Sequence, residues 1–349
     1  MKNICVVTVY NSINSGSYWQ AKALGDYLGK SNNVFYLRRS DIDASSHPLK
    51  KIRRIVKYLV KFNIKAAVRE LKIIRRFSRL GKNFRTIKMG DKAMANIDYV
   101  VLGSDTIWNL NSKYFEKNYK KYFGGIFQNK KVITYAPSVA NTSVAKFEEK
   151  PDIIDMLNRM SNISVRDQKT AEIVKHLTGR EPVIVCDPTM LLTKEEYLAQ
   201  ARKRLIKNNF VFLYLFDSLT GSQIKQLQQF AKEKNLEIVS GTKNFKFADR
   251  RFVNAPDLFL QNMIDADYVI TDTFHGTVFS ALLNKNFVVI NRKKDKVADL
   301  LDKLHLEGQI VGNNDMIAKL QDSINYDKVN RTINKMREVS VNYLRSSIK

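Results

Sequence analysis

One segment of this chain gathers more chemically active side chains than any other. Residues 268–283 begin as an apolar run typical of a buried strand and continue with helical spacing from residue 277. The turn between them contains Thr271, Asp272, Thr273, His275 and Gly276. Ligands bind at such turns in α/β sheets, and a helix start favours phosphate or carboxylate. We therefore predict that His275 moves a proton to a bound anion; the alternative is that it caps or packs the helix start.

A second candidate turn, Gly103-Ser104-Asp105, closes the apolar run 98–102. The Asp105 carboxylate can take a proton from a hydroxyl or orient a sugar, and Trp108 can stack on a sugar ring. The alternative interpretation makes Ser104 or Asp105 a helix cap and Trp108 a core residue.

Arginine and serine side chains follow two further predicted strands. Arg166 comes directly after residues 162–165, and its guanidinium suits a carboxylate or phosphate. The alternative is a structural ion pair, with Asp167 or another acid. In the loop 11–17, Ser17 can bind an anion or cap the helix expected over 18–30, and the loop does not match a dinucleotide motif.

Length and composition indicate a globular protein of two domains. The chain has 349 residues, of which 44% are hydrophobic, enough for more than one core. Its two cysteines, Cys5 and Cys186, form no metal-binding motif and no disulfide framework, and no residue cluster has metal-ligand spacing. Because no signal peptide or membrane span is recognisable, we expect a cytoplasmic protein.

The net charge of +25 is concentrated in one part of the chain. Residues 50–92 hold sixteen Lys or Arg residues against Glu70 and Asp91. Apolar residues recur there at helical spacing, so the segment predicts basic amphipathic helices. Such helices suit an anionic membrane surface. The alternatives are docking on the protein's own core or binding to nucleic acid, and no nucleic-acid recognition motif supports the latter.

Strand and helix patterns alternate along most of the chain, which predicts parallel sheets covered by helices. The alternation restarts at residue 210. We expect a first domain over 1–205 with the basic helical insert at 48–92, and a second over 206–314 that carries the His275 turn. An amphipathic helix over 315–349 is expected to return to the first domain. A cleft between the two sets of strand ends would place the first domain's loops opposite His275.

Six short motifs, in order along residues 10–290, resemble the polysaccharide pyruvyl transferase family. They are Asn14-Ser-Gly-Ser17 with Gln20, Val101-Leu-Gly-Ser-Asp105 with Trp108, Tyr135-Ala-Pro-Ser138, Ile163-Ser-Val-Arg-Asp167, Val185-Cys-Asp-Pro-Thr-Met-Leu191 and Thr271-Asp-Thr-Phe-His-Gly276. The resemblance implies two Rossmann-like domains in a GT-B-like arrangement. It also implies transfer of a pyruvyl group from phosphoenolpyruvate to a pair of sugar hydroxyls, as a ketal, with no cofactor.

The resemblance assigns a role to each candidate residue. His275 and Asp105 would be catalytic, His275 as general acid. The donor site would comprise Arg166, Gly276, Thr273, Thr271, Ser17 and Lys296, and the acceptor site Trp108, Ser104 and Ser138. Members of the family often carry arginine two residues before the histidine, where this chain has Thr273. Either Lys293, Lys294 or Lys296 would supply the charge, or the donor would differ.

The expected partners are a small anionic donor, a saccharide or lipid-linked saccharide acceptor and, through residues 50–92, the inner leaflet of the cell membrane. Two alternatives remain open. The first is a GT-B-like glycosyltransferase that uses a nucleotide sugar, and the second is a non-catalytic scaffold on the membrane.

Overall fold

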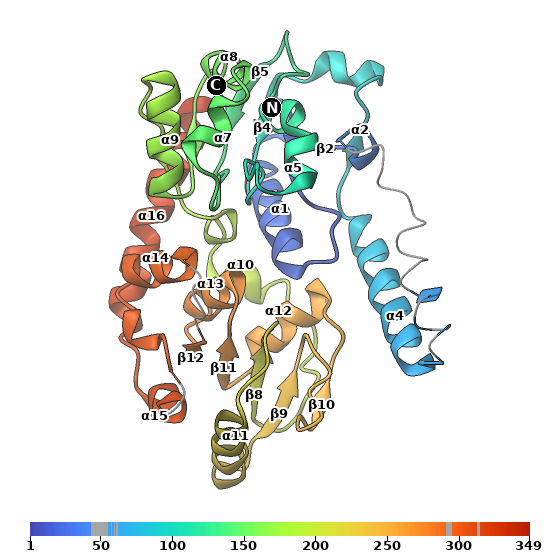
Figure 1. The fold of residues 1–349 in the computed structure, drawn as a ribbon, viewed down its shortest axis with the longest axis vertical. Coiled ribbons are helices and arrows are strands. Elements are labelled where there is room, and N and C mark those ends of the chain that lie inside the picture. Colours follow the sequence, from blue (N-terminus) through green and yellow to red (C-terminus); the bar gives the residue numbers. More distant parts are fainter. Residues whose placement is uncertain (43–54, 57, 59, 61, 291–294, 313–314) are drawn as a thin grey trace. The chain divides into compact units, whose positions relative to one another are not determined.

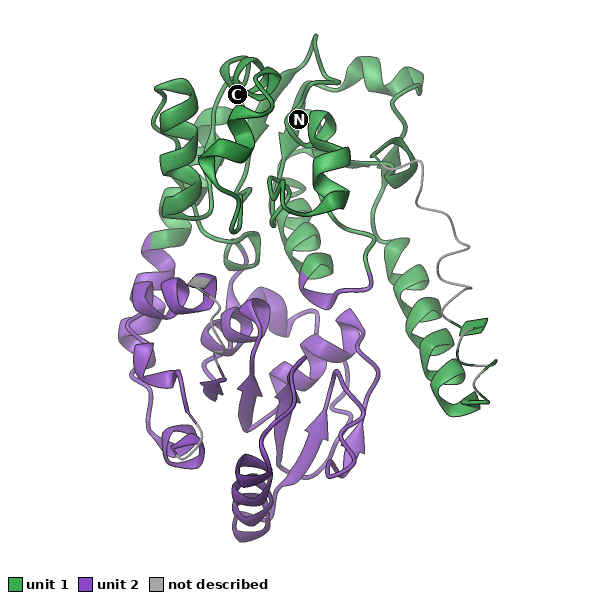
Figure 2. Ribbon diagram, viewed as in Figure 1, with its two compact units in different colours: residues 1–12, 17–191, 336–349 green, residues 13–16, 192–335 purple. Residues whose placement is uncertain are grey.

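The computed structural model describes residues 1–42, 55, 56, 58, 60, 62–290, 295–312 and 315–349 (Figure 1). They form two compact units, coloured separately in Figure 2. Unit 1 comprises residues 1–12, 17–191 and 336–349, and unit 2 comprises 13–16 and 192–335. The domain limits expected at residues 205 and 314 stay a prediction.

Unit 1 contains a parallel five-stranded sheet in the order β3-β2-β1-β4-β5. At its centre, β1 (Asn3–Val7) is fully buried over residues 4–7, as expected for a strand covered on both faces. The neighbouring strands are β2 (Asn33–Leu37), β3 (Thr86–Ile87), β4 (Tyr99–Leu102) and β5 (Lys131–Thr134). A parallel pair, β6 (Ser164–Val165) and β7 (Val183–Ile184), continues beyond β5 through a bridge from Ile133 to Asn162.

The helices of unit 1 connect these strands. They are α1 (Ser15–Leu28), α2 (Arg39–Ile42), α4 (Ile64–Gly81), α5 (Lys113–Lys117), α6 (Tyr119–Tyr122), α7 (Val144–Glu148), α8 (Asp152–Asn158) and α9 (Gln168–Thr178). The final helix, α16 (Tyr326–Ser347), begins in unit 2 and ends in unit 1. There Ser340 Oγ accepts a hydrogen bond from Cys186 N at 2.9 Å, so the end of α16 is anchored beside β7.

Unit 2 repeats the architecture with the strand order β10-β9-β8-β11-β12, all parallel. Its strands are β8 (Phe210–Tyr214), β9 (Glu237–Ser240), β10 (Arg250–Arg251), β11 (Tyr268–Thr271) and β12 (Asn286–Val289). Its helices are α10 (Lys194–Leu198), α11 (Gly221–Glu233), α12 (Pro256–Asp265), α13 (Phe274–Leu282), α14 (Asp295–Lys303) and α15 (Met316–Gln321). Two parallel α/β sheets were predicted from the alternation of patterns, and the structure confirms them.

One helix prediction is wrong in extent. The helix expected over residues 315–349 is two helices separated by residues 322–325. That stretch contains Asp, Ser and Asn, whose side chains compete with the helical hydrogen bonds.

The basic insert is partly described. Its helix α4 is capped by Asn63, whose side chain accepts a hydrogen bond from Ala66 N at 3.0 Å, and it buries Phe77 and Leu80. The helical prediction for residues 48–54, 57, 59 and 61 lies outside the described residues. Across the described part of the chain, no helix combines the length and the apolar character needed to cross a membrane.

Candidate active site

The His275 turn is built by hydrogen bonds among its own residues. Thr273 is the N-cap of α13, and its hydroxyl accepts a hydrogen bond from Gly276 N at 2.9 Å. The Thr271 hydroxyl donates to Tyr214 O at 2.9 Å, which ties the turn to the end of β8. A Cβ on Gly276 would lie 2.6 Å from Thr273 Oγ, so only glycine fits this helix start.

These bonds change the roles expected for three donor-site candidates. The Gly276 N–H donates to the Thr273 cap, and its expected part in donor binding stays a prediction. Thr271 is fully buried beneath the turn. Thr271, Thr273 and Gly276 therefore position His275, and Thr273 brings no charge to the site.

The imidazole of His275 packs directly on a loop from the other end of the sequence. A Cβ on Gly16 would lie only 2.7 Å from His275 Cγ, and closer still to Nδ1. That loop is held in unit 2 by a 2.7 Å hydrogen bond from Ser15 Oγ to Asn254 Oδ1. The ring is half-buried and stands edge-on to Phe274. Contacts within unit 2 therefore fix this ring, and its Nε2 atom is buried.

One cation predicted for the donor site lies near this turn. The Lys296 ammonium is 5.7 Å from the ring centroid of Phe274, the residue before His275, and its side chain is exposed. Lys293 and Lys294 are outside the described residues.

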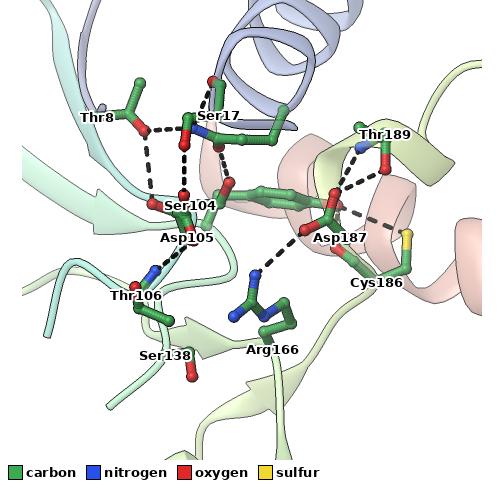
Figure 3. A network of polar contacts seen from close by, with 12 residues as sticks. Thr8, Ser17, Ser104, Asp105, Thr106, Ser138, Arg166, Cys186, Asp187 and Thr189 are labelled. Atoms are coloured by element: carbon green, nitrogen blue, oxygen red, sulfur yellow. Dashed lines mark hydrogen bonds and ion pairs between the residues drawn. The ribbon is translucent and has the colours of Figure 1, made fainter. Parts of the chain in front are cut away.

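A buried polar network lies at the carboxyl edge of the unit 1 sheet (Figure 3). Ser17 Oγ donates to Asp105 Oδ2 at 3.1 Å, and Thr106 N donates to Asp105 Oδ1 at 2.8 Å. Asp105 has a φ of 73°, a left-handed conformation that costs a non-glycine residue on the order of 1 kcal/mol. Backbone outliers of this kind cluster at functional sites, which supports the prediction that the Asp105 carboxylate is catalytic.

Gln20 is the centre of this network, a role that sequence reasoning missed. Its side-chain amide donates to Thr8 Oγ at 3.0 Å and to Ser17 O at 3.1 Å, and its carbonyl oxygen accepts from the Ser104 hydroxyl. Gln20 is fully buried one helical turn into α1. The spacing of a glutamine after the Ser17 loop was the available signal.

Arg166 lies at the same edge, beyond the neighbouring strands. The backbone joins the turns in series: Ser138 N donates to Asp105 O at 2.9 Å, and Arg166 N donates to Pro137 O at 3.2 Å. The Arg166 guanidinium forms a buried ion pair with Asp187 at 3.3 Å (Figure 3). The structure thus identifies the acid left open by the sequence: the partner in this pair is Asp187.

Asp187 is itself held by Thr189. Its Oδ1 accepts from Thr189 N at 3.1 Å and from Thr189 Oγ at 2.7 Å, which orients the other oxygen toward Arg166. The preceding residue, Cys186, is also buried, and burial raises the pKa of its thiol to about 11. This turn fixes Arg166 and contributes no reactive thiolate.

The acceptor-site candidates are buried. Trp108 is only 1% exposed; its ring stacks on Phe123 and its indole N–H donates to Tyr122 O at 3.0 Å. A ring enclosed in this way offers no face to a sugar, so the stacking role expected of Trp108 is wrong. Ser104 and Ser138 are buried as well, and the Ser138 hydroxyl accepts a hydrogen bond from Ala140 N. These residues support the site from beneath.

The structure therefore brings the candidates together in two sets. Ser17, Ser104, Asp105, Ser138 and Arg166 belong to unit 1, whereas Thr271, Thr273, His275, Gly276 and Lys296 belong to unit 2. Whether Arg166 and His275 act on one ligand stays a prediction. Among the described residues, no group of three or more His, Cys, Asp or Glu side chains could hold a metal ion.

Solved structures of other proteins have a fold similar to that of this chain. The chain resembles the UDP-GlcNAc 2-epimerase from Methanocaldococcus jannaschii (10% identity, 96% of this chain and 92% of that chain, TM-score 0.51). It also resembles the UDP-GlcNAc 2-epimerase from Neisseria meningitidis bound to UDP-GlcNAc (11% identity, 99% of this chain and 100% of that chain, TM-score 0.53). At such low identity the likeness shows the fold alone, a GT-B-like α/β architecture. A search of curated proteins finds no match.

A family model of known enzymes matches most of the sequence. The model described as polysaccharide pyruvyl transferase covers residues 14–294, which include every candidate residue of both sets except Lys296. The chain therefore belongs to the polysaccharide pyruvyl transferase family.

Proposed function

We propose that this enzyme transfers a pyruvyl group from phosphoenolpyruvate to two hydroxyls of one sugar in a surface polysaccharide or its lipid-linked precursor. Family membership supports the reaction class. The observation that carries the proposal is the half-buried His275 imidazole, fixed by Gly16 and Phe274 at the start of α13. An imidazole held in one orientation at a helix start suits proton transfer to a bound anion.

The proposed reaction is balanced without a cofactor. C3 of the donor gains a proton, one acceptor hydroxyl adds to C2, the second hydroxyl replaces the phosphate at C2, and a ketal forms. One of the two hydroxyl protons replaces the proton delivered to C3, and the other leaves with inorganic phosphate. His275 is the proposed general acid, and Asp105 is the proposed acceptor of a hydroxyl proton.

Arg166 is the proposed cation for the donor's carboxylate or phosphate. Its side chain is buried, where electrostatic attraction is stronger than in water, and Asp187 holds its orientation. Because Thr273 is neutral, we propose that Lys296 supplies further positive charge beside His275. Gly16, which contacts His275, and Ser17, which donates to Asp105, are consecutive in the chain.

Thermal shift measurements test the donor. Phosphoenolpyruvate should raise the melting temperature, because a ligand at about 100 times its Kd stabilises the native state by about 2.7 kcal/mol. Arg166→Ala should abolish the shift, whereas Arg202→Ala, which removes a solvent-exposed arginine, should retain it. If a nucleotide sugar stabilises the protein and phosphoenolpyruvate does not, the enzyme is instead a glycosyltransferase.

We also propose that the start of α4 binds an anionic membrane surface. Phe62 is 92% exposed and Ile64 is 66% exposed, with Val68 exposed one helical turn further on. The same helix carries Lys65 and Lys72, and each basic group near an anionic leaflet contributes about 1 kcal/mol. Large exposed apolar side chains beside cations favour a lipid interface over nucleic acid.

Liposome flotation tests this surface. The protein should float with anionic vesicles and not with neutral ones, and Phe62→Ser with Ile64→Ser should weaken flotation. Val339→Ser, at another exposed apolar position, is the matched control. Equal flotation with both lipids would refute charge-driven docking. A scaffold role would be indicated if His275→Ala left the polysaccharide unchanged while loss of the basic charges abolished it.

A further inference from the structure

A pocket of about 220 Å³ lies at the carboxyl end of β1, entirely within unit 1. It is lined by residues 8–12 after β1, by Arg39 and Ile42 of α2, and by the rings of Tyr114, Phe115 and Tyr122. We propose that this pocket binds one pyranose ring of the acceptor saccharide. The assignment rests on the proposed function, because that function requires a sugar hydroxyl pair as acceptor.

The aromatic wall is preformed. The rings of Tyr114 and Phe115 are half-buried and lie 5.1 Å apart, and Phe115 packs edge-on against Tyr122 at 5.2 Å. The indole N–H of Trp108 donates a hydrogen bond to the backbone carbonyl of Tyr122. Sugar rings present apolar C–H faces that pack on such rings, so the stacking expected of Trp108 falls to Tyr114 and Phe115.

Polar groups of the same lining suit sugar hydroxyls. Ser12 Oγ is buried and has no hydrogen-bond partner among the described residues, and it lines the pocket. A buried hydroxyl without a partner costs free energy, which a ligand hydroxyl would recover. The Arg39 guanidinium, which donates to Asn11 O, also lines the pocket.

Hydrogen bonds link the pocket to the residue before the proposed proton acceptor, Asp105. Thr8 lines the pocket and accepts a hydrogen bond from Gln20, whose carbonyl oxygen accepts from Ser104, the residue before Asp105. Its volume is below the range of about 300–1,000 Å³ common for drug-sized ligands, so it suits one ring and is too small for a nucleotide sugar. Lys121 Nζ donates to Ile42 O at 2.7 Å and so ties α6 to α2, two helices that contribute to the lining.

Saturation-transfer NMR with methyl pyranosides (glucosides, galactosides and mannosides of both anomers) tests this assignment without turnover. At least one should bind, and Phe115→Ala should weaken it about tenfold or more, as expected when a stacking face is lost. Ser12→Ala should weaken it about fivefold, the value of one hydrogen bond. Tyr119→Ala removes a half-buried ring of α6 that does not line the pocket, and should leave binding unchanged.

The phosphoenolpyruvate thermal shift separates failure of this inference from failure of the proposed function. If no pyranoside binds, or if binding survives both Phe115→Ala and Ser12→Ala, the pocket assignment is overturned even when the donor shift is intact. If pyranosides bind as expected and phosphoenolpyruvate gives no shift, the pocket stands and the donor proposal fails. Ser12→Ala keeps the test decisive should Phe115→Ala lower stability.

Discussion

The contact between Gly16 and His275 gives the sharpest prediction. A Cβ on Gly16 would lie 2.7 Å from His275 Cγ. Ordinary carbon contacts lie at about 3.5–4.0 Å, so in Gly16→Ala the ring must retreat by about 1 Å. A displacement of about 1 Å at a catalytic group costs roughly 100-fold in rate. Overpacking of this kind also lowers the free energy of unfolding by about 1–3 kcal/mol.

Two measurements check this outcome. The rate of phosphate release from phosphoenolpyruvate with acceptor should fall about 100-fold. The imidazole resonance of His275, assigned among the four histidines with His275→Gln, should shift in the folded protein. Urea denaturation then gives the stability change, which separates a moved ring from an unfolded chain.

Gly221→Ala is the matched control. Gly221 is the first residue of α11, and a Cβ there meets nothing within 4 Å. We expect unchanged activity and a stability change of at most about 1 kcal/mol, in the stabilising direction. If Gly16→Ala matched this control in both rate and imidazole resonance, the inferred packing of His275 on Gly16 would be refuted.

Three further predictions concern buried titratable groups. Asp187→Asn leaves the Arg166 guanidinium buried without its counter-charge, so urea denaturation should show a free energy of unfolding lower by about 3–5 kcal/mol. Because burial raises the pKa of Cys186 to about 11 and that of Cys5 to about 12, neither thiol should react with iodoacetamide at pH 8 until the chain unfolds. Burial lowers the pKa of Lys285 to about 8, so the unfolded chain binds more protons between pH 8 and 10.5, and the Lys285 contribution to stability should rise with pH there.

For each of these three predictions, one experimental result would contradict it. An Asp187→Asn variant as stable as the wild type would show that the ion pair is not buried in solution. Rapid labelling of the thiols in the native protein would show that the two cysteines are not buried in solution. For Lys285, the difference in unfolding free energy between wild type and Lys285→Met should rise by about 1–2 kcal/mol in favour of the wild type between pH 7.5 and 9.5. A flat difference would contradict the lowered pKa.

Local sequence determined the strands and helices of this protein and which of its turns carry polar side chains. Continuous apolar runs such as residues 4–7 are typical of strands covered on both faces, and their alternation with helical patterns implies parallel sheets. The polar turn before α13 was recognisable because its cap, Thr273, acts on a residue three positions away. The six motifs sufficed for the family because their order along the chain is itself sequence information.

Tertiary structure alone decided the partners of the functional groups. Arg166 pairs with Asp187, 21 residues away, and Ser15 bonds to Asn254, 239 residues away. Such contacts exist only after strand order has brought distant turns to one sheet edge, and no local pattern encodes that order. Burial is decided in the same way: Trp108 follows a polar turn and is still enclosed by Phe123, because the side chains that cover it come from the next helices of the fold.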